Sequence, residues 1–331
     1  MMRRSFRRLP VRRPRPARQL VGLAAVAVVL VGVLAGPVYL SPYFVVLAYS
    51  LFTSITLAQA WNLVGGYGGQ FSLAHGMFVG VGSYTTGVLL IHTTAPLAVA
   101  IVLSGLCAGA IAALTGLPLF RLRGHYLAVG SLGVALAAQT WMVNWSHTAA
   151  SSGLTLPDRA MLDGTAQYYL AAGLLILTVL CIALVVRSRF GLRLMAIRDN
   201  EAAAAELGVE GLAVKLGAFV LSAFFVGIAG ALIAVQQISI EPVSAFSITW
   251  TFTMITMAVI GGPSTLMSPV LGAIVLFALQ QQFQDYESWS TLVTGVALIL
   301  IVVLAPAGLW GAFHAGARRL SRVWPFRRQS M

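Results

Sequence analysis

Long apolar stretches, separated by short polar or glycine- and proline-containing breaks, run through most of the chain. A transmembrane helix needs about 20 predominantly apolar residues. Ten stretches approach this pattern: 20–40, 43–63, 71–91, 96–118, 125–145, 167–186, 216–236, 246–260, 267–283 and 289–309. The pattern therefore predicts an all-α integral membrane protein with about ten transmembrane helices.

The stretch 71–91 and the two stretches that flank Gly261 are less regular than the others. The segment "WNLVGGYGGQFSLAHGMFVGVGSYTTGVLL" at 61–90 holds eight glycines and no Lys, Arg, Asp or Glu. Each of these stretches is either a plain transmembrane span or a broken, re-entrant helix. The irregular backbone of a broken helix is tolerated only inside protein or beside a cavity. The glycines also fit close helix packing, because small residues let helices approach in lipid. Three G-x-x-x-G pairs favour packing: Gly32 and Gly36, Gly76 and Gly80, and Gly105 and Gly109.

The composition excludes a water-soluble domain. The chain is 59% hydrophobic and 9% charged, whereas soluble domains are about 25% charged. Its net charge of +12 is concentrated at the two ends, with eight arginines in residues 1–18 and five in residues 318–328. Basic residues that flank apolar spans set topology and contact anionic headgroups. They therefore indicate membrane lipid as a partner, and not nucleic acid.

The distribution of charge also predicts the orientation. With ten spans and an inside N-terminus, 20 of the 21 Lys and Arg residues fall in inside loops and only Arg159 falls outside, as the positive-inside rule requires. Both termini are thus expected to be cytoplasmic. The first span is expected to be retained, because its apolar run exceeds the about 7–15 residues of a signal-peptide core. The predicted parts are a basic N-terminal arm at 1–19, a transmembrane domain at 20–312 with a cytoplasmic loop at 187–215, and a basic tail at 313–331.

The sequence lacks the residues that several classes of function require. There is no G-x-x-x-x-G-K-[ST] motif, and Lys215 is the only lysine, so ATP hydrolysis on a P-loop is excluded. Every Asp and Glu falls in a loop or at the edge of a span, which disfavours an ion-coupled transporter and a membrane enzyme acting on lipid. Cys107 and Cys181 lie in apolar runs without the polar context of a metal site. We expect no catalytic residue, no metal and no cofactor.

The inside loop contains a compact helix signal, "DNEAAAAELG" at 199–208. Asn200 or Asp199 can cap the first turn, Glu201 favours the positive helix N-terminus, and Gly208 can end the helix. A helix this short is marginal in water unless it packs on something. The lipid surface is one candidate, but the four alanines offer little apolar bulk, so docking on another protein is favoured.

Polar residues around the glycine-rich segment form a candidate translocation path. They are Gln59, Asn62, Gln70, Ser72, His75 and Tyr84. For His75, a buried imidazole bonded to a neighbouring group is favoured over direct substrate contact. The segments "GGYGGQFSLAHG" at 65–76 and "GGPSTLMSPVLG" at 261–272 echo each other faintly, and such glycine-interrupted pairs can mark the central site of a repeat-built transporter.

Several of these stretches together resemble a known family. They are the segment at 61–90, "FRLRGHYLAVGSLGVALAAQT", "SRFGLRLMAIRDNEAAAAELGVEGLAVKLGAFVLSAFFVGIAGAL", "AVIGGPSTLMSPVLGAIV" and "LAPAGLWG". They resemble the inner-membrane permease subunits of ABC importers for branched-chain amino acids, of the hydrophobic amino acid and urea-type branch. The resemblance covers about residues 43–312. The arginine-rich arm is outside the family pattern.

The resemblance implies a bacterial inner-membrane permease that works by alternating access. Its implied partners are a second permease subunit, two separate ABC ATPase subunits and a periplasmic or extracellular substrate-binding protein. The positions that match the ATPase-coupling helix are Arg198, Asn200, Glu201, Glu206 and Gly208. The glycine lies one residue later than in the general permease loop motif, so contact geometry is not carried over. A urea or short-chain amide permease, and a self-sufficient secondary transporter or channel, stay open as alternatives.

Overall fold

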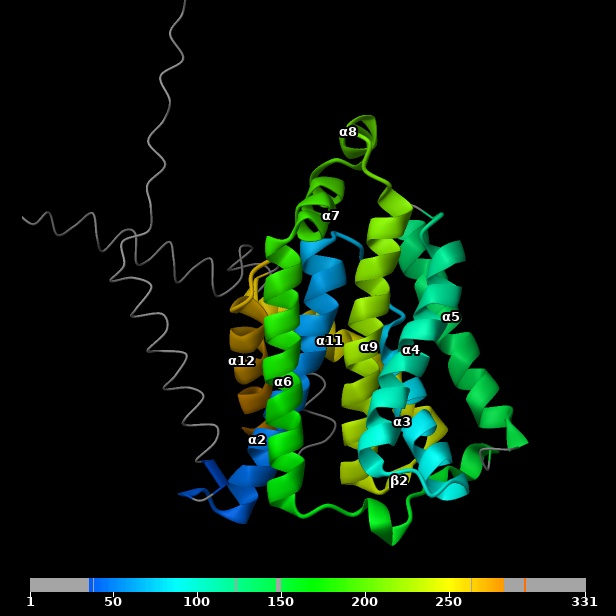
Figure 1. Cartoon of the computed structure of the whole chain (residues 1–331), viewed down its shortest axis with the longest axis vertical. Helices are drawn as coiled ribbons and strands as arrows, with labels where there is room; N and C mark the ends of the chain where they lie inside the picture. Colours follow the sequence, from blue (N-terminus) through cyan, green and yellow to red (C-terminus); the bar gives the residue numbers. More distant parts are fainter. Residues whose placement is uncertain are drawn as a thin grey trace, which may run out of the picture.

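The computed structural model describes residues 36–37, 39–122, 124–146, 150–262, 264–282 and 295, and this part of the chain is mostly helical (Figure 1). The long helices are α2 (Pro42–Asn62), α3 (His75–His92), α4 (Leu97–Leu119), α5 (His125–Asn144), α6 (Gly164–Arg187), α9 (Gly211–Gln237), α11 (Ile248–Gly261) and α12 (Ser268–Gln282). The short elements are η1 (Leu63–Tyr67), η3 (Ala150–Ser152), β1 (Leu154–Thr155), η4 (Asp158–Ala160), α7 (Arg189–Asp199), α8 (Glu201–Glu206), β2 (Ser239–Ile240) and α10 (Pro242–Ala245).

Eight of the ten predicted stretches coincide with a long helix, from α2 to α12. The stretches 20–40 and 289–309 lie almost entirely outside the described residues. Six helical segments of the described part are long and apolar enough to cross a membrane: Pro42–Tyr67, Leu97–Leu119, His125–Asn144, Gly164–Arg187, Gly211–Gln237 and Pro242–Gly261. The chain is thus an all-α membrane protein, while the number of ten spans stays a prediction.

Helix α9 is the centre of the fold. In its most apolar 18-residue window, 83% of the residues are buried, against 22% for α5. It packs on α2, α3 and α4 (Figure 1). Glycine makes the α3–α9 crossing possible, because a Cβ on Gly82 would lie 2.0 Å from the carbonyl oxygen of Gly227. Ser83 Oγ adds a 2.9 Å hydrogen bond to the carbonyl of Gly230 across the same crossing.

Close packing also accounts for glycines of the predicted G-x-x-x-G pairs. A Cβ on Gly105 of α4 would lie 2.7 Å from the side chain of Ile228 on α9. On α3, a Cβ on Gly80 would lie 2.4 Å from the ring of Phe246. The packing interpretation of these glycines is therefore confirmed at both positions. Gly32 lies outside the described residues.

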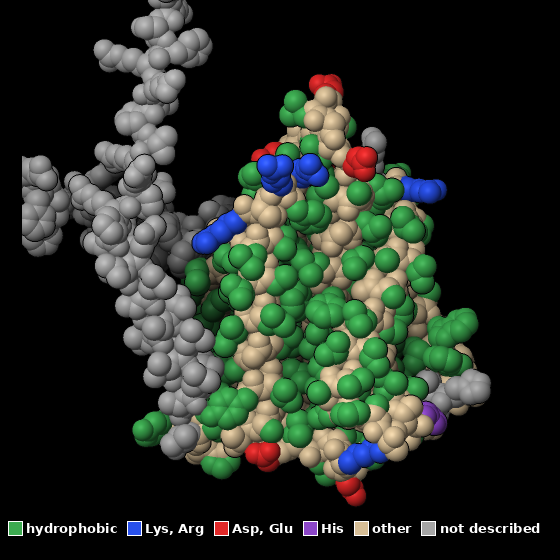
Figure 2. Space-filling view, viewed as in Figure 1, with side chains coloured by type: hydrophobic (Ala, Val, Ile, Leu, Met, Phe, Trp, Pro, Cys, Tyr) green, Lys and Arg blue, Asp and Glu red, His purple; other side chains and the backbone are tan. Residues whose placement is uncertain are grey.

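The outer helices expose an apolar belt. Leu177, Leu180 and Leu184 of α6 are all exposed, and only 28% of the most apolar window of α6 is buried. In Figure 2 hydrophobic side chains cover the middle of the visible face, whereas Lys, Arg, Asp and Glu gather at its two ends. Lipid can solvate such a belt and water cannot, which explains the low charge content.

The two ends of the molecule are built differently. The α8 end carries α7 and α8, and the β2 end carries the connection from α5 to α6, at opposite ends in Figure 1. At the β2 end, β1 and β2 pair in antiparallel fashion, with Leu154 opposite Ile240 and Thr155 opposite Ser239. Side chains make the corresponding links at the α8 end, as described next.

Candidate functional site

The predicted loop 187–215 contains two short helices, α7, which was not predicted, and α8, which was. Ser188 caps α7 by accepting hydrogen bonds from the backbone N–H groups of Phe190 and Gly191. The Oδ1 atom of Asn200 accepts a 3.1 Å bond from Ala203 N and caps α8, so Asn200 rather than Asp199 fills this role. Helix α8 has six residues, and Gly208, with φ +81°, lies where the chain leaves it. The predicted helix at 199–208 is thus present in shorter form.

An ion pair fastens α8 to the central helix. Lys215 Nζ of α9 lies 2.7 Å from Glu201 Oε2 at the first position of α8. The lysine side chain is only 4% exposed and the glutamate side chain is 44% exposed. Ala204 also faces inward, whereas Glu206 and Leu207 are exposed. Helix α8 therefore has a side that is attached to α9 and a side that is free to meet another molecule.

Arg198, the penultimate residue of α7, lies at the surface, but its guanidinium bonds to neighbouring groups of the protein. Its Nε and Nη2 atoms donate to Asp199 Oδ1 at 2.9 and 2.8 Å. Its Nη1 atom donates to Ser264 Oγ at 2.8 Å. The guanidinium therefore joins the α7–α8 joint to the turn between α11 and α12.

Two of the candidate path residues hold that turn. Asn62 is completely buried, accepts from Ser264 N at 3.2 Å and donates to the carbonyl of Thr265 at 3.1 Å. Gln59, one turn earlier on α2 and also completely buried, donates to the carbonyl of Leu266 at 2.5 Å. These two side-chain amides thus form hydrogen bonds with backbone N–H and C=O groups of a turn that lies more than 200 residues later in the sequence.

The entry to α3 is a broken helix. The chain leaves η1 at Tyr67 and becomes helical again only at His75, later than the predicted start at residue 71. The Nε1 atom of Trp61 donates to the carbonyl of Ser72 at 3.1 Å. Side chains of two other helices satisfy Leu73: Ser131 Oγ accepts from its N–H at 2.8 Å and Thr251 Oγ1 donates to its carbonyl at 3.2 Å. Irregular backbone inside a membrane protein requires such partners, and here protein side chains provide them.

His75 is a completely buried imidazole. Its Nε2 atom lies 3.0 Å from Ser222 Oγ, and that hydroxyl donates to the carbonyl of Ala60 at 2.7 Å. The rings of Phe78 and Phe219 meet it edge-on. This geometry agrees with the favoured interpretation of His75 as a buried, hydrogen-bonded histidine.

The remaining candidates lie apart from one another. Gln70 bonds locally to the carbonyl of Gly68 at 3.1 Å, and Ser72 is buried in the broken entry. The hydroxyl of Tyr84 reaches the carbonyl of Ile240 at the β2 end, at 3.3 Å. Within the part of the chain that the structure describes, the six residues thus make separate hydrogen bonds in different places, and their role in translocation stays a prediction.

Several residues of this network escaped the sequence analysis. An ion pair of Lys215 could have been predicted from the sequence, because a lone lysine near the start of an apolar span needs a partner. Nothing in the sequence distinguishes the four hydroxyl residues of the network, because Ser and Thr are common in membrane helices and bond to their own backbone as readily as to another helix. These residues are Ser131, Ser222, Thr251 and Ser264.

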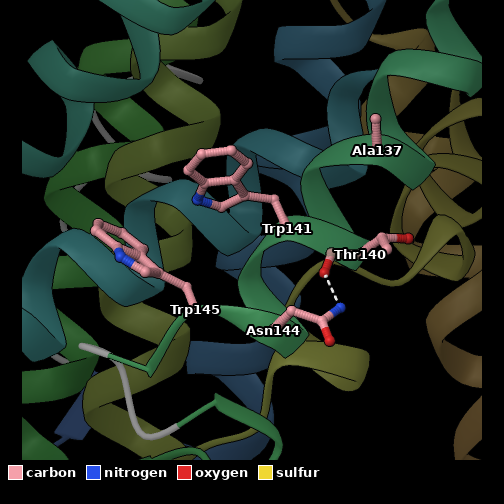
Figure 3. A pocket seen from close by; sticks show the side chains of 5 residues that line it. All are labelled: Ala137, Thr140, Trp141, Asn144 and Trp145. Carbon is pink, nitrogen blue, oxygen red and sulfur yellow. Dashed lines mark hydrogen bonds between the residues drawn. The ribbon is translucent and has the colours of Figure 1, made fainter.

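An open cavity of about 630 Å³ lies along the last turns of α5, near the β2 end. It is lined by Ala137, Thr140, Trp141, Asn144 and Trp145 (Figure 3). Asn144 Nδ2 donates to the carbonyl of Thr140 at 2.8 Å, and the two indole rings meet at an angle of 62°. Tryptophans at the end of a membrane helix are typical of the lipid–water interface.

The fold and this site define the class: a multi-pass helical membrane protein whose glycine-rich, broken segments are tied to a short helix outside the apolar belt. A family model described as "Branched-chain amino acid transport system / permease component" matches residues 43–303. The chain belongs to this family of transport permeases, as its resemblance predicted.

Curated relatives agree with the family assignment. Over 285 residues, the chain is 28% identical to the high-affinity branched-chain amino acid transport system permease protein LivM of Escherichia coli K12, covering 77% of this chain and 67% of the relative. Over 322 residues, it is 27% identical to the protein of the same name from Salmonella typhimurium LT2, covering 88% and 75%. No solved structure matches the chain significantly.

Proposed function

We propose that this chain is a permease subunit of an ATP-driven ABC importer that moves branched-chain or other hydrophobic amino acids across the bacterial inner membrane. A second permease subunit would complete the path, two ABC ATPase subunits would bind at the α8 end, and a substrate-binding protein would deliver substrate at the β2 end. The observation that carries the proposal is α8 itself, a short helix with an exposed side and a partly buried ion pair to the central helix.

The distribution of charge supports placing the α8 end in the cytoplasm. The arginines of the loop 187–215 lie at that end, in and beside α7, and Arg159 lies in η4, in the α5–α6 connection at the other end. The positive-inside rule then orients the α8 end toward the cytoplasm, where ATP is available. Family membership and the lack of a P-loop in the sequence both support hydrolysis on a separate subunit.

The proposed mechanism is alternating access. A ligand or nucleotide can shift a two-state equilibrium only through a difference in its binding free energy between the states. ATP would supply that difference on the ATPase subunits, and their movement would displace α8. The Glu201–Lys215 pair would pass the displacement to α9, which packs on α2, α3 and α4. An apolar amino acid needs few fixed charges along such a path.

Glu206 offers the cleanest test. It is exposed, and changing it leaves the Glu201–Lys215 pair intact, whereas a change at Glu201 alters both docking and the attachment of α8. The chain would be purified from its native membrane in mild detergent, and the proteins recovered with it would be identified by mass spectrometry. We expect an ATPase with a P-loop to accompany the wild type and to be lost from Glu206→Arg.

The matched control is Asp163→Arg, an exposed charge reversal at the β2 end. It should retain the ATPase. The proposal would be wrong if the chain were recovered without any ATPase and if the pure chain in liposomes took up substrate along a gradient. The chain would then be a self-sufficient transporter. Screening the accompanying binding protein with leucine and urea would separate the amino acid from the amide substrate.

A further inference from the structure

Two turns that are far apart in sequence, the first of them rich in glycine, meet at the α8 end. They are residues 64–69, after α2, and residues 264–267, before α12, and we call them the paired turns. Ser264 Oγ donates to the carbonyl of Gly66 at 2.7 Å, and Asn62 bonds Ser264 N at 3.2 Å. Gly66 must lack a side chain, because a Cβ there would lie 2.0 Å from Asn62 Oδ1 and 2.9 Å from Ser264 N.

Arg198 contacts both of the paired turns. Its Nη1 atom donates to Ser264 Oγ at 2.8 Å in the second turn. In the first turn, Gly69 has φ +64° and lies against the arginine stem, so that a Cβ there would be 2.6 Å from Arg198 Cγ. One side chain thus packs on the first turn and hydrogen-bonds the second.

The same guanidinium also fixes the joint that leads into α8. Two of its nitrogens hold Asp199 Oδ1, and the next residue, Asn200, is the cap of α8. A planar guanidinium can hold a carboxylate on one edge and a hydroxyl on another, whereas a lysine ammonium is a single point charge. Arg198 is an exposed residue, but these contacts leave its side chain 31% exposed.

From this geometry we propose that Arg198 is a positioning residue that ties the α7–α8 joint to both paired turns, so that the turns move as one unit with the coupling helix. The inference rests on the proposed function and gives it a residue that transmits motion. In this division of roles, Glu206 meets the ATPase, Lys215 holds α8 on α9, and Arg198 carries the displacement to the broken segments beside α3 and α12.

The first experiment needs only the full chain in detergent. Hydrogen exchange of backbone amides would be followed in residues 64–69 and 264–267 of the wild type, Arg198→Ala and Ser264→Ala. The matched control is Arg193→Ala, an exposed arginine on the same helix. We expect Arg198→Ala and Ser264→Ala to speed exchange in both turns by about tenfold, the factor for one hydrogen bond of ordinary strength. Faster exchange in one turn alone, or in neither, would overturn the link.

The second experiment uses the complete importer in proteoliposomes, with its ATPase subunits and binding protein. Uptake of radiolabelled leucine, valine and isoleucine would be compared with ATP hydrolysis. We expect Arg198→Ala to lower uptake about tenfold, while ATP hydrolysis stays within about twofold of wild type. The uptake of Arg198→Lys should lie between that of the wild type and that of Arg198→Ala, and the uptake of Arg193→Ala should match the wild type. Parallel loss of uptake and hydrolysis, or no loss of either, would show that Arg198 does not transmit motion.

The two experiments separate the inference from the function on which it rests. If the wild-type complex shows no ATP-driven uptake, the proposed function fails and the transport role of Arg198 fails with it. The exchange result would still decide whether Arg198 joins the two turns to each other.

Discussion

The α8 end and the β2 end of this protein are held together by different kinds of bond. At the α8 end, side chains make the links, through Glu201–Lys215 and Arg198–Ser264. At the β2 end, backbone pairing is added to side-chain links such as Tyr84–Ile240: β1 pairs with β2, and Leu156 N donates to the carbonyl of Ile238 at 2.8 Å. Side-chain links can rearrange by rotation about single bonds, whereas a backbone ladder must break to move. The α8 end is therefore the end suited to motion, and the β2 end is suited to remain fixed.

Reversing the charge of Lys215 should cause the largest loss of stability at the α8 end. Lys215→Glu places a second carboxylate beside Glu201 in a position that is now 4% exposed. Breaking a buried pair costs about 3–5 kcal/mol, and screening of the half-exposed Glu201 favours the lower value. We expect a lower melting temperature in detergent and faster proteolysis of the loop 187–215.

The double variant Glu201→Lys with Lys215→Glu is the control for that prediction. It restores an ion pair with the opposite polarity, so it should recover a clear part of the lost stability. Equal melting temperatures for the single and double variants would show that the pair does not hold α8 on α9.

The Asn62 amide tests the link between the paired turns. Asn62→Leu keeps the volume similar but leaves Ser264 N and the carbonyl of Thr265 without this partner. Buried groups left unpaired cost about 1–3 kcal/mol each, and because both of these groups are only partly buried we expect a loss near the lower limit, about 2–3 kcal/mol in total. Gln70→Leu, which removes a local bond to Gly68, should shift the melting temperature far less. Similar shifts for the two variants would show that Asn62 does not hold the paired turns together.

Gly153 tests the fixed character of the β2 end. It has φ +74°, and a Cβ there would lie 2.5 Å from the carbonyl oxygen of Ile240, beside the strand pair. Gly153→Ala should cost about 1–2 kcal/mol from backbone strain and should loosen β1 from β2 without affecting the paired turns. Hydrogen exchange of residues 154–156 and 238–240 measures this effect.

Gly164→Ala provides the matched control at the same end. It lies at the start of α6, and an added Cβ would meet only Val45 Cγ1, at 3.9 Å. Alanine is the better helix former, so stability should stay the same or rise slightly. If both alanine variants loosen the strand pair equally, the β2 end is less fixed than its backbone pairing indicates.

The sequence predicted where the helices lie better than it predicted which helices and side chains contact one another. The boundaries of α4, α5 and α6 differ from the predicted stretches by only a few residues, because a membrane span needs a fixed apolar length. The start of α3 at His75 was missed because the preceding residues are as apolar as a helix, and their break is set by Trp61, Ser131 and Thr251. The G-x-x-x-G pairs predicted close contact, which Gly80 makes with Phe246 and Gly105 makes with α9, but they did not say which element each glycine would meet.

By itself, the sequence determined the membrane class, most of the positions of the long helices, the start of α8 at Asp199 or Asn200, and the exclusion of a P-loop, because each depends on local composition or spacing. Only the tertiary structure decided that Asn62 holds residues 264–265, that Lys215 pairs with Glu201, and that Arg198 faces Ser264. A polar side chain in an apolar helix must find a partner, since an unpaired buried group is costly. Which partner it finds depends on how the helices pack, and the local pattern of residues does not contain that information.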